Sequence, residues 1–395
     1  MKNAHQRLRR GAAVLLGIVF LVSGLLKIAD PIGTMLIITE YAKFFHVPFI
    51  IPAARVLGIL LGLLESTLGV ILITGVLRKV AAICSCVLLG LFTVVTIILW
   101  IANPNMDCGC FGQAIHLSHA QSFFKNVFLL ALAAFAFLPW KEFGAPKRRK
   151  WVASGLAVLA LLYAVLYSNT HLPIVDYTDF SWGAELFASL DDDVELDNHY
   201  QTAYVYEKNG RQGTFFLNQL PDSTWTFVRA DSLFVLGPAR KKGHPILSFR
   251  NGEGEYCDSL AANGKVVVFS VYDPEKAPWE RLQKQYQSVA AVGARPLLLV
   301  ATSPDAVDTF GIPIDLTVYY ADFKTLISLN RSNGGGAHFD DGELVHKWPT
   351  NDFPENIDYE LNIVDPVEQS AYMISRRHVK AQGFVLYLAA LLILL

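Results

Sequence analysis

The first 170 residues alternate between long apolar runs and short polar loops. Five runs approach the roughly 20 residues that a helix needs to cross a bilayer. The pattern predicts membrane-spanning helices at residues 11–28, 56–76, 80–101, 123–140 and 151–168. No small-residue cleavage site follows the first run, so we expect it to be retained rather than removed as a signal peptide. This half is therefore predicted to be a polytopic helical bundle in a lipid bilayer.

Beyond residue 170 the runs become shorter and the pattern is that of a soluble protein. Residues 171–243 carry short alternating stretches separated by turn residues, which predicts a small β-rich region. After residue 243, continuous apolar runs at 266–271 and 295–300 predict buried strands, with a helical pattern at 279–289 between them. A third strand near 316–320, short helices and a hairpin through Asp341-Gly342 follow, so this part is predicted to be an α/β domain.

The C-terminal 13 residues, 383–395, form one more apolar stretch. At about 1.5 Å per residue, this stretch is short for a hydrocarbon core of about 30 Å. It is either a short sixth span or an interfacial anchor, and we favour the span.

Composition and charge agree with this division. Apolar residues make up 53% of the chain, charged residues only 17%, and the mean hydropathy is +0.36. Residues 1–170 carry 15 Lys and Arg against 5 Asp and Glu, whereas residues 171–395 carry 18 against 30. An acidic soluble half excludes a nucleic-acid binder with a broad basic face.

The basic residues also predict an orientation. They concentrate at the N-terminus, at Arg78-Lys79 and between 141 and 150, which are the loops expected on the cytoplasmic side. Five spans that start inside would place residues 170–380 outside. In a bacterial cell this predicts an inner-membrane protein with a cytoplasmic N-terminus and a periplasmic soluble half.

A short loop between the third and fourth predicted helices carries Cys108-Gly109-Cys110. Glycine tolerates the backbone angles that so small a disulfide ring demands, and a strained bond is easier to reduce. We therefore interpret Cys108 and Cys110 as a redox pair. A structural disulfide that pins a turn is one alternative. A Cys2His2 metal site with His116 and His119 is another, but the spacing and the oxidising compartment disfavour it, and no metal is predicted.

Glu65 lies in the middle of the second predicted helix. A charged carboxylate at this depth costs several kcal/mol, so it should be protonated or paired inside the bundle. It is a candidate proton group, with a quinone as the candidate cofactor beside it. A hydrogen-bonded carboxyl group that only fixes helix packing is the equal alternative. We expect Lys27 to extend toward the interface rather than reach Glu65, and Cys84 and Cys86 to pack as apolar residues.

Two parts of this half resemble a known family. The first helix, with Ser23-Gly24-Leu25-Leu26-Lys27-Ile28-Ala29-Asp30-Pro31, resembles the DoxX/DoxD superfamily. The Glu65 helix and the loop Asp107-Cys108-Gly109-Cys110-Phe111-Gly112 look like its MauE branch. The resemblance covers residues 1–140 and implies a four-helix inner-membrane unit linked to periplasmic thiol–disulfide chemistry. It implies no particular enzymatic activity.

The α/β domain, in its order of elements and local strings, resembles the periplasmic TlpA/thioredoxin-like family. That family carries Cys-x-Pro-Cys at a helix start, but this chain has Lys276-Ala277-Pro278-Trp279 there. Gly334-Gly335-Gly336 stands near the usual cis-proline position. The resemblance therefore implies a domain without dithiol chemistry that binds a partner. Cys257 is expected to be a buried apolar side chain, and His338 and His346 are expected to face solvent.

These inferences divide the chain into five parts: a DoxX/MauE-like four-helix domain (1–140), a basic loop with a fifth helix (141–170), a β-rich region (171–243), a thioredoxin-like domain lacking redox cysteines (244–375) and a hydrophobic C-terminal helix (376–395). The leading hypothesis is a membrane thiol–disulfide oxidoreductase that acts through Cys108 and Cys110, with an envelope or membrane protein as partner. The alternative is a non-catalytic scaffold or accessory subunit whose periplasmic domain docks onto an envelope complex.

Overall fold

A computed structural model describes most of the two halves. The described residues are 2–104, 106, 108–115, 117–138, 146–173, 176–181, 183–186, 194–196, 199–208, 211–215, 224–235, 239–241, 247–362, 382–384, 386–387 and 390.

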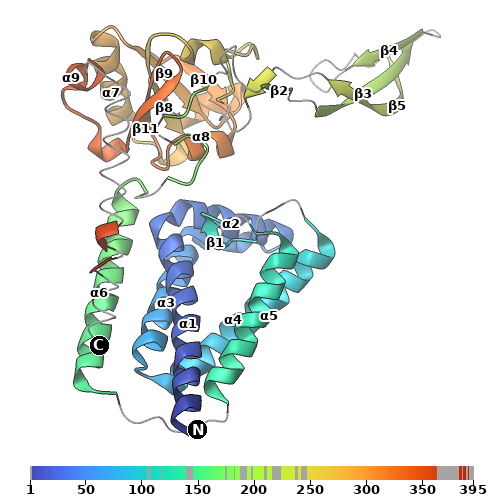
Figure 1. Ribbon diagram of the computed structural model, residues 1–395. Helices are drawn as coiled ribbons and strands as arrows, with labels where there is room; N and C mark the ends of the chain where they lie inside the picture. Colours follow the sequence, from blue (N-terminus) through green and yellow to red (C-terminus); the bar gives the residue numbers. More distant parts are fainter. Residues whose placement is uncertain are drawn as a thin grey trace.

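The N-terminal half is a bundle of long helices, which Figure 1 shows below the soluble part. Among the described residues, five helices are long and apolar enough to cross a membrane, as the sequence predicts. They lie in α1 (Lys2–Ala29), α3 (Ala54–Thr74), α4 (Arg78–Ala102), α5 (His119–Phe137) and α6 (Arg148–Thr170). The protein is therefore a membrane protein whose bundle lies in lipid.

Helices α1 and α3 approach each other through glycines. A Cβ atom on Gly24 would lie 2.5 Å from the carbonyl oxygen of Gly62, and one on Gly69 would lie 2.7 Å from that of Gly17. Small residues allow helices in lipid to pack backbone against backbone. This close packing places the polar side chains of the two helices within reach of each other.

One helix was not predicted. Residues expected to form only a loop contain α2 (Pro31–Phe44), followed by a 3-10 helix at Pro48–Ala53. Asp30 caps α2 by accepting a hydrogen bond from the backbone N–H of Gly33, and Pro31 occupies its first position. At 14 residues α2 is too short to span a bilayer, so it does not stand out in the sequence as a long apolar run.

The opposite end of the bundle is basic. Arg10, Arg78 and Lys150 donate hydrogen bonds to backbone carbonyls around the C-terminus of α3, on Leu72, Gly75 and Thr74 respectively. In Figure 1 the N-terminus lies at this end, away from α2 and the soluble part. The basic residues that predict the cytoplasmic side are thus gathered at one end of the molecule.

The α/β part contains a six-stranded sheet in the order β12-β11-β8-β9-β10-β7. Its strands are β7 (Phe249–Arg250), β8 (Lys265–Val271), β9 (Arg295–Val300), β10 (Val318–Ala321), β11 (Gly335–Asp340) and β12 (Glu343–Trp348). Strands β8, β9 and β10 are parallel, and the hairpin β11–β12 pairs antiparallel with β8. The predicted strands and hairpin are confirmed.

Helices cover both faces of this sheet. Helix α7 (Trp279–Ala291), with α9 (Ile357–Leu361), packs on one face, and α8 (Phe323–Leu329) packs on the other. Burial of both faces explains why the central strands are continuous apolar runs. One of the short helices expected in this part is a 3-10 helix, Pro304–Phe310.

The β-rich region forms two small sheets. One joins β3 (His199–Lys208), β4 (Arg211–Phe215) and β5 (Thr226–Val235) in the order β4-β3-β5. The other pairs β2 (Val194–Leu196) with β6 (Ala239–Lys241). Most of the C-terminal stretch 383–395 lies outside the described residues, but Phe384 packs against a cluster that includes Val70 of α3 and Leu161 of α6.

The prediction that His338 and His346 face solvent is wrong. His338 is 2% exposed and His346 is 7% exposed. Helices cover both faces of the sheet, so alternation along β11 and β12 gives no exposed face, and both imidazole rings lie against Trp348. Burial, the charge of His346 and that of Lys265 lower the pKa of His338 to about 3.

This shift predicts that the α/β part loses stability in mild acid. His338 is neutral when folded but takes up a proton near pH 6.5 when unfolded, so stability falls as the pH drops below that value. We expect a loss of about 2 kcal/mol between pH 7.5 and 5. Urea unfolding of the full chain in detergent, monitored by pulse proteolysis, measures it. A His338→Phe variant should lose most of this dependence, and an unchanged dependence would contradict the assignment.

Candidate functional site

The cysteine loop lies at the end of the bundle that faces the soluble part. Strand β1 (Cys110–Gln113) follows Cys108 and lies against α1 and α2, as Figure 1 shows. Cys108 is buried, Cys110 is half-buried, and neither is in a disulfide in this structure. The loop is therefore held inside the protein, within reach of the helices around it.

The backbone of both cysteines is anchored. The Tyr41 hydroxyl donates a hydrogen bond to the carbonyl of Cys108, and Lys27 Nζ donates one to the carbonyl of Cys110 at 2.6 Å. Gly109 between them has a φ of +60°, and a Cβ there would lie 2.3 Å from Ile37. Only glycine fits this position, so the two thiols are presented by a fixed turn.

Lys27 and Glu65 form a buried ion pair, which corrects the expectation that Lys27 extends away. Lys27 Nζ lies 2.8 Å from Glu65 Oε2, and the two residues are 3% and 1% exposed. Gly62 of α3 faces Lys27 and leaves room for its chain to cross between the helices. The expectation that Glu65 is paired inside the bundle is confirmed.

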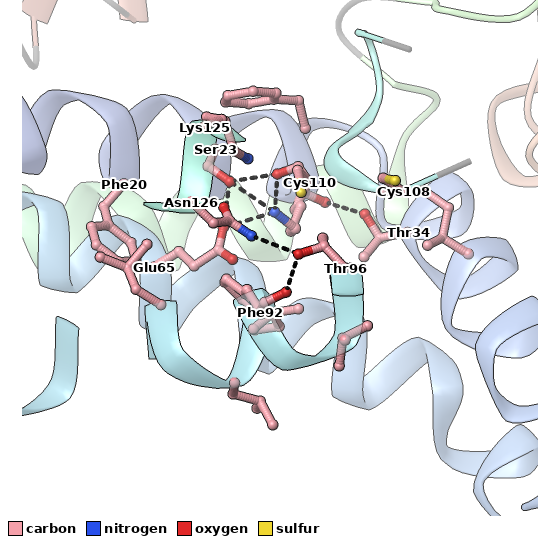
Figure 2. A pocket seen from close by; sticks show the side chains of 18 of the residues that line it. Phe20, Ser23, Thr34, Glu65, Phe92, Thr96, Cys108, Cys110, Lys125 and Asn126 are labelled. Atoms are coloured by element: carbon pink, nitrogen blue, oxygen red, sulfur yellow. Dashed lines mark hydrogen bonds and ion pairs between the residues drawn. The ribbon is translucent and has the colours of Figure 1, made fainter. Parts of the chain in front are cut away.

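Ser23 completes the polar cluster shown in Figure 2. Its Oγ lies 2.7 Å from both Glu65 Oε2 and the Cys110 carbonyl oxygen, and it accepts a hydrogen bond from Lys27 Nζ at 2.8 Å. All three ammonium hydrogens of Lys27 thus have acceptors. The carboxylate in the bundle is connected to the cysteine loop through this cluster.

His119 contacts the first thiol. Its Nδ1 lies 2.9 Å from Cys108 Sγ, and its Nε2 lies 3.1 Å from the carbonyl oxygen of Pro104. A carbonyl can only accept, so Nε2 carries the proton of a neutral ring and Nδ1 is free to accept one from the thiol. His119 is therefore placed to act as a base for Cys108. His116, the other histidine of the metal alternative, lies outside the described residues.

An apolar cavity of about 250 Å³ adjoins the cysteine loop. Both cysteines, Glu65 and residues of α1, α2, α4 and α5 line it. Figure 2 shows Asn126 and Thr96 at its wall, with Asn126 Nδ2 donating to Thr96 Oγ1 at 3.4 Å. Glu65 Oε1 has no hydrogen-bond partner within the described part of the chain. The two thiols and the Glu65 carboxylate thus line the same cavity within the helical bundle.

The remaining cysteines lie elsewhere. Cys84 is half-buried in the α1–α3–α4–α5 core, but Cys86 is exposed on α4, so the expectation that both are packed is wrong. Side chains two positions apart on a helix point in divergent directions, which accounts for the difference. Cys257 packs against the core of the α/β part, as an apolar side chain would, but it is half-buried rather than buried as expected.

The soluble part contacts the bundle beside the cysteine loop. Arg331, 6% exposed, extends from the end of α8 and donates to Asp30 Oδ2 at 2.9 Å and to Gln113 Oε1. Gln113 ends the strand that Cys110 begins, and Asp30 caps α2. Lys324 of α8 also pairs with Glu40 of α2 at 2.7 Å, although this pair is exposed. One buried arginine thus joins the soluble part, α2 and the cysteine strand.

Comparison with known proteins supports the class of the bundle. The fold and the site define a class of protein: a membrane-embedded helical unit that carries a cysteine loop at one end. Residues 6–139 match the family described as methylamine utilisation protein MauE. Residues 200–235 match a domain of unknown function. No curated protein and no solved structure matches the chain. The match is consistent with an accessory role in a membrane.

Sequence reasoning selected Cys108, Cys110 and Glu65, and the structure brings all three to one cavity. It missed the role of His119 as a partner of Cys108, and it missed Arg331. An arginine in a predicted loop after a short helix gives no local signal, because its partners lie more than 200 residues away.

Proposed function

We propose that this protein catalyses thiol–disulfide exchange through Cys108 and Cys110 at the outer end of its membrane bundle. The observation that carries the proposal is the contact between Cys108 Sγ and His119 Nδ1, beside a second thiol on the same anchored turn. A base next to a thiol favours the thiolate, which is the form that attacks and leaves in exchange.

The exchange is balanced in atoms and electrons. In the oxidised pair, a thiolate of a substrate dithiol attacks Cys110, the more exposed of the two residues, and the Cys108–Cys110 bond breaks. Cys108 leaves as a thiolate and receives its proton through His119. The second substrate thiol then attacks the substrate sulfur of the mixed disulfide and releases Cys110. The substrate loses two electrons and two protons, and the pair gains them.

The soluble part serves as a partner-binding domain. Its strand order and hairpin support a thioredoxin-like arrangement, in which residues 276–279 would occupy the redox position. Those residues carry no thiol, so the domain contributes recognition rather than electrons. Docking through Arg331 holds the loop after α8 beside the cysteine strand. A protein bound to this domain is thereby brought close to Cys110.

The location follows from the charge rule applied to the bundle. Arg10, Arg78 and Lys150 gather at the end opposite the soluble part. Positive residues mark the cytoplasmic side, so the cysteine loop and the soluble part lie in the periplasm of a bacterial inner membrane. An oxidising compartment allows a disulfide to form and persist there.

Trapping of mixed disulfides tests the proposal. Exchange is reversible, and in the reverse direction Cys110 attacks a substrate disulfide and Cys108 resolves the mixed disulfide. A Cys108→Ser variant lacks this resolving thiol, so covalent adducts between Cys110 and oxidised substrate should accumulate in intact membranes. Acid quenching, alkylation and non-reducing electrophoresis detect them. Cys86→Ser, which removes an exposed thiol remote from the loop, should show none. If neither Cys108→Ser nor Cys110→Ser yields adducts, the accessory-scaffold role replaces exchange.

A further inference from the structure

We propose that the cavity beside the cysteine loop binds a lipid-soluble quinone, and that Glu65 Oε1 accepts a hydrogen bond from its reduced, hydroxyl-bearing head. The redox part of this inference rests on the proposed exchange function. The binding part stands on the cavity alone.

The lining of the cavity suits an apolar ligand that enters from the membrane. Most of its wall is apolar, and it includes Leu91, which is 56% exposed on the side of α4 that faces lipid. Its volume of about 250 Å³ is slightly below the roughly 300–1,000 Å³ of pockets that enclose whole drug-sized molecules. A space of this size suits one ring, with an apolar tail left in the bilayer.

One buried acceptor at the polar end of the cavity has no donor. Glu65 is 1% exposed, and its Oε2 accepts hydrogen bonds from Lys27 and Ser23, whereas Oε1 has no partner within the described residues. Lys27 has already used its three hydrogens on Ser23, Glu65 and Cys110. Leaving a buried acceptor unmatched is unfavourable, and more so when the group is charged. A ligand hydroxyl would satisfy this oxygen.

The thiol pair also needs an electron acceptor. After one exchange it holds two electrons and two protons, and the other described cysteines lie outside the cavity. Cys110 and Glu65 both line the cavity. When bound there, a quinone takes up two electrons and two protons as the Cys108–Cys110 bond forms, and it becomes a hydroquinone. The two electrons and two protons of the thiol pair then leave on a carrier that is soluble in the bilayer.

Photolabelling of the full chain in lipid nanodiscs tests the site. A short-chain azidoquinone should label the protein, and unlabelled quinone should displace it. Val95 lines the cavity, whereas its neighbour Val94 is 55% exposed and does not line it. Val95→Trp should fill the space and reduce labelling at least tenfold. Val94→Trp adds the same bulk toward lipid and should leave labelling within twofold.

The outcomes separate the two proposals. Cys86→Ser, at an exposed thiol that does not line the cavity, should label like the unchanged protein. Labelling that Val95→Trp leaves unaltered, or that phospholipid displaces as well as quinone does, would overturn the quinone site, even if mixed disulfides are trapped. Labelling without trapped adducts would keep the site and overturn exchange.

Discussion

Replacing Lys27 with methionine is expected to destabilise the bundle by about 3–5 kcal/mol, since it leaves the Glu65 carboxylate buried without its cation. The same change removes the hydrogen bond that holds the Cys110 carbonyl. Unfolding in mixed micelles, followed by tryptophan fluorescence, measures the loss.

Two controls make this result specific. Lys125→Met removes a half-buried cation that lies 4.7 Å from the Phe111 ring centre, and it should cost about 1 kcal/mol or less. Combining Lys27→Met with Glu65→Met removes both charges and should restore most of the lost stability. A single Lys27→Met variant that unfolds within 1 kcal/mol of the unchanged protein would contradict a buried ion pair.

Arg331→Met is expected to release the soluble part from the bundle. Arg331 and Asp30 are each 5% exposed at the side chain, and truncating one partner of such a pair costs about 2–5 kcal/mol. We therefore expect amide hydrogen exchange in α2 and β1 to speed up by at least tenfold, because both segments lose a contact to the soluble part.

The matched control is Lys324→Met on the same surface. Its ion pair with Glu40 is exposed, at 71% and 31% for the two side chains, so its loss should cost at most about 1 kcal/mol. Exchange in α2 should then stay within a few-fold of the unchanged protein. Equal effects of the two substitutions would mean that Arg331 does not anchor the domain.

The elements that sequence alone predicts are those with a strong repeating pattern. The five long helices and strands β8 and β9 are apolar runs, and their residues fix their type and burial directly. Helix α2 was not predicted because it is too short to span a bilayer, and because its N-terminal signal, Asp30-Pro31, directly follows the longer apolar run of the first helix. The burial of His338 was not predicted because alternation in a hairpin does not reveal that helices cover both faces of the sheet.

The site was predicted only in part for a related reason. Cys108 and Cys110 stand in one short motif, so their proximity is local. The partners that give them chemistry come from α1, α3 and α5, and these contacts depend on how the helices pack. Lys27 reaches Glu65 by passing over Gly62, which has no side chain. This contact joins two helices, so no spacing along one helix could reveal it.

The most direct test of the central claim is the redox state of Cys108 and Cys110 in intact membranes. Thiol alkylation with a mass shift, across a series of glutathione buffers and with Cys108→Ser as control, gives the midpoint of the pair. If the protein catalyses thiol–disulfide exchange, the pair should titrate reversibly with a midpoint reduction potential between about −270 and −120 mV. This is the span of proteins that exchange disulfides. A pair that stays oxidised below about −300 mV would be a structural bond and would contradict the account.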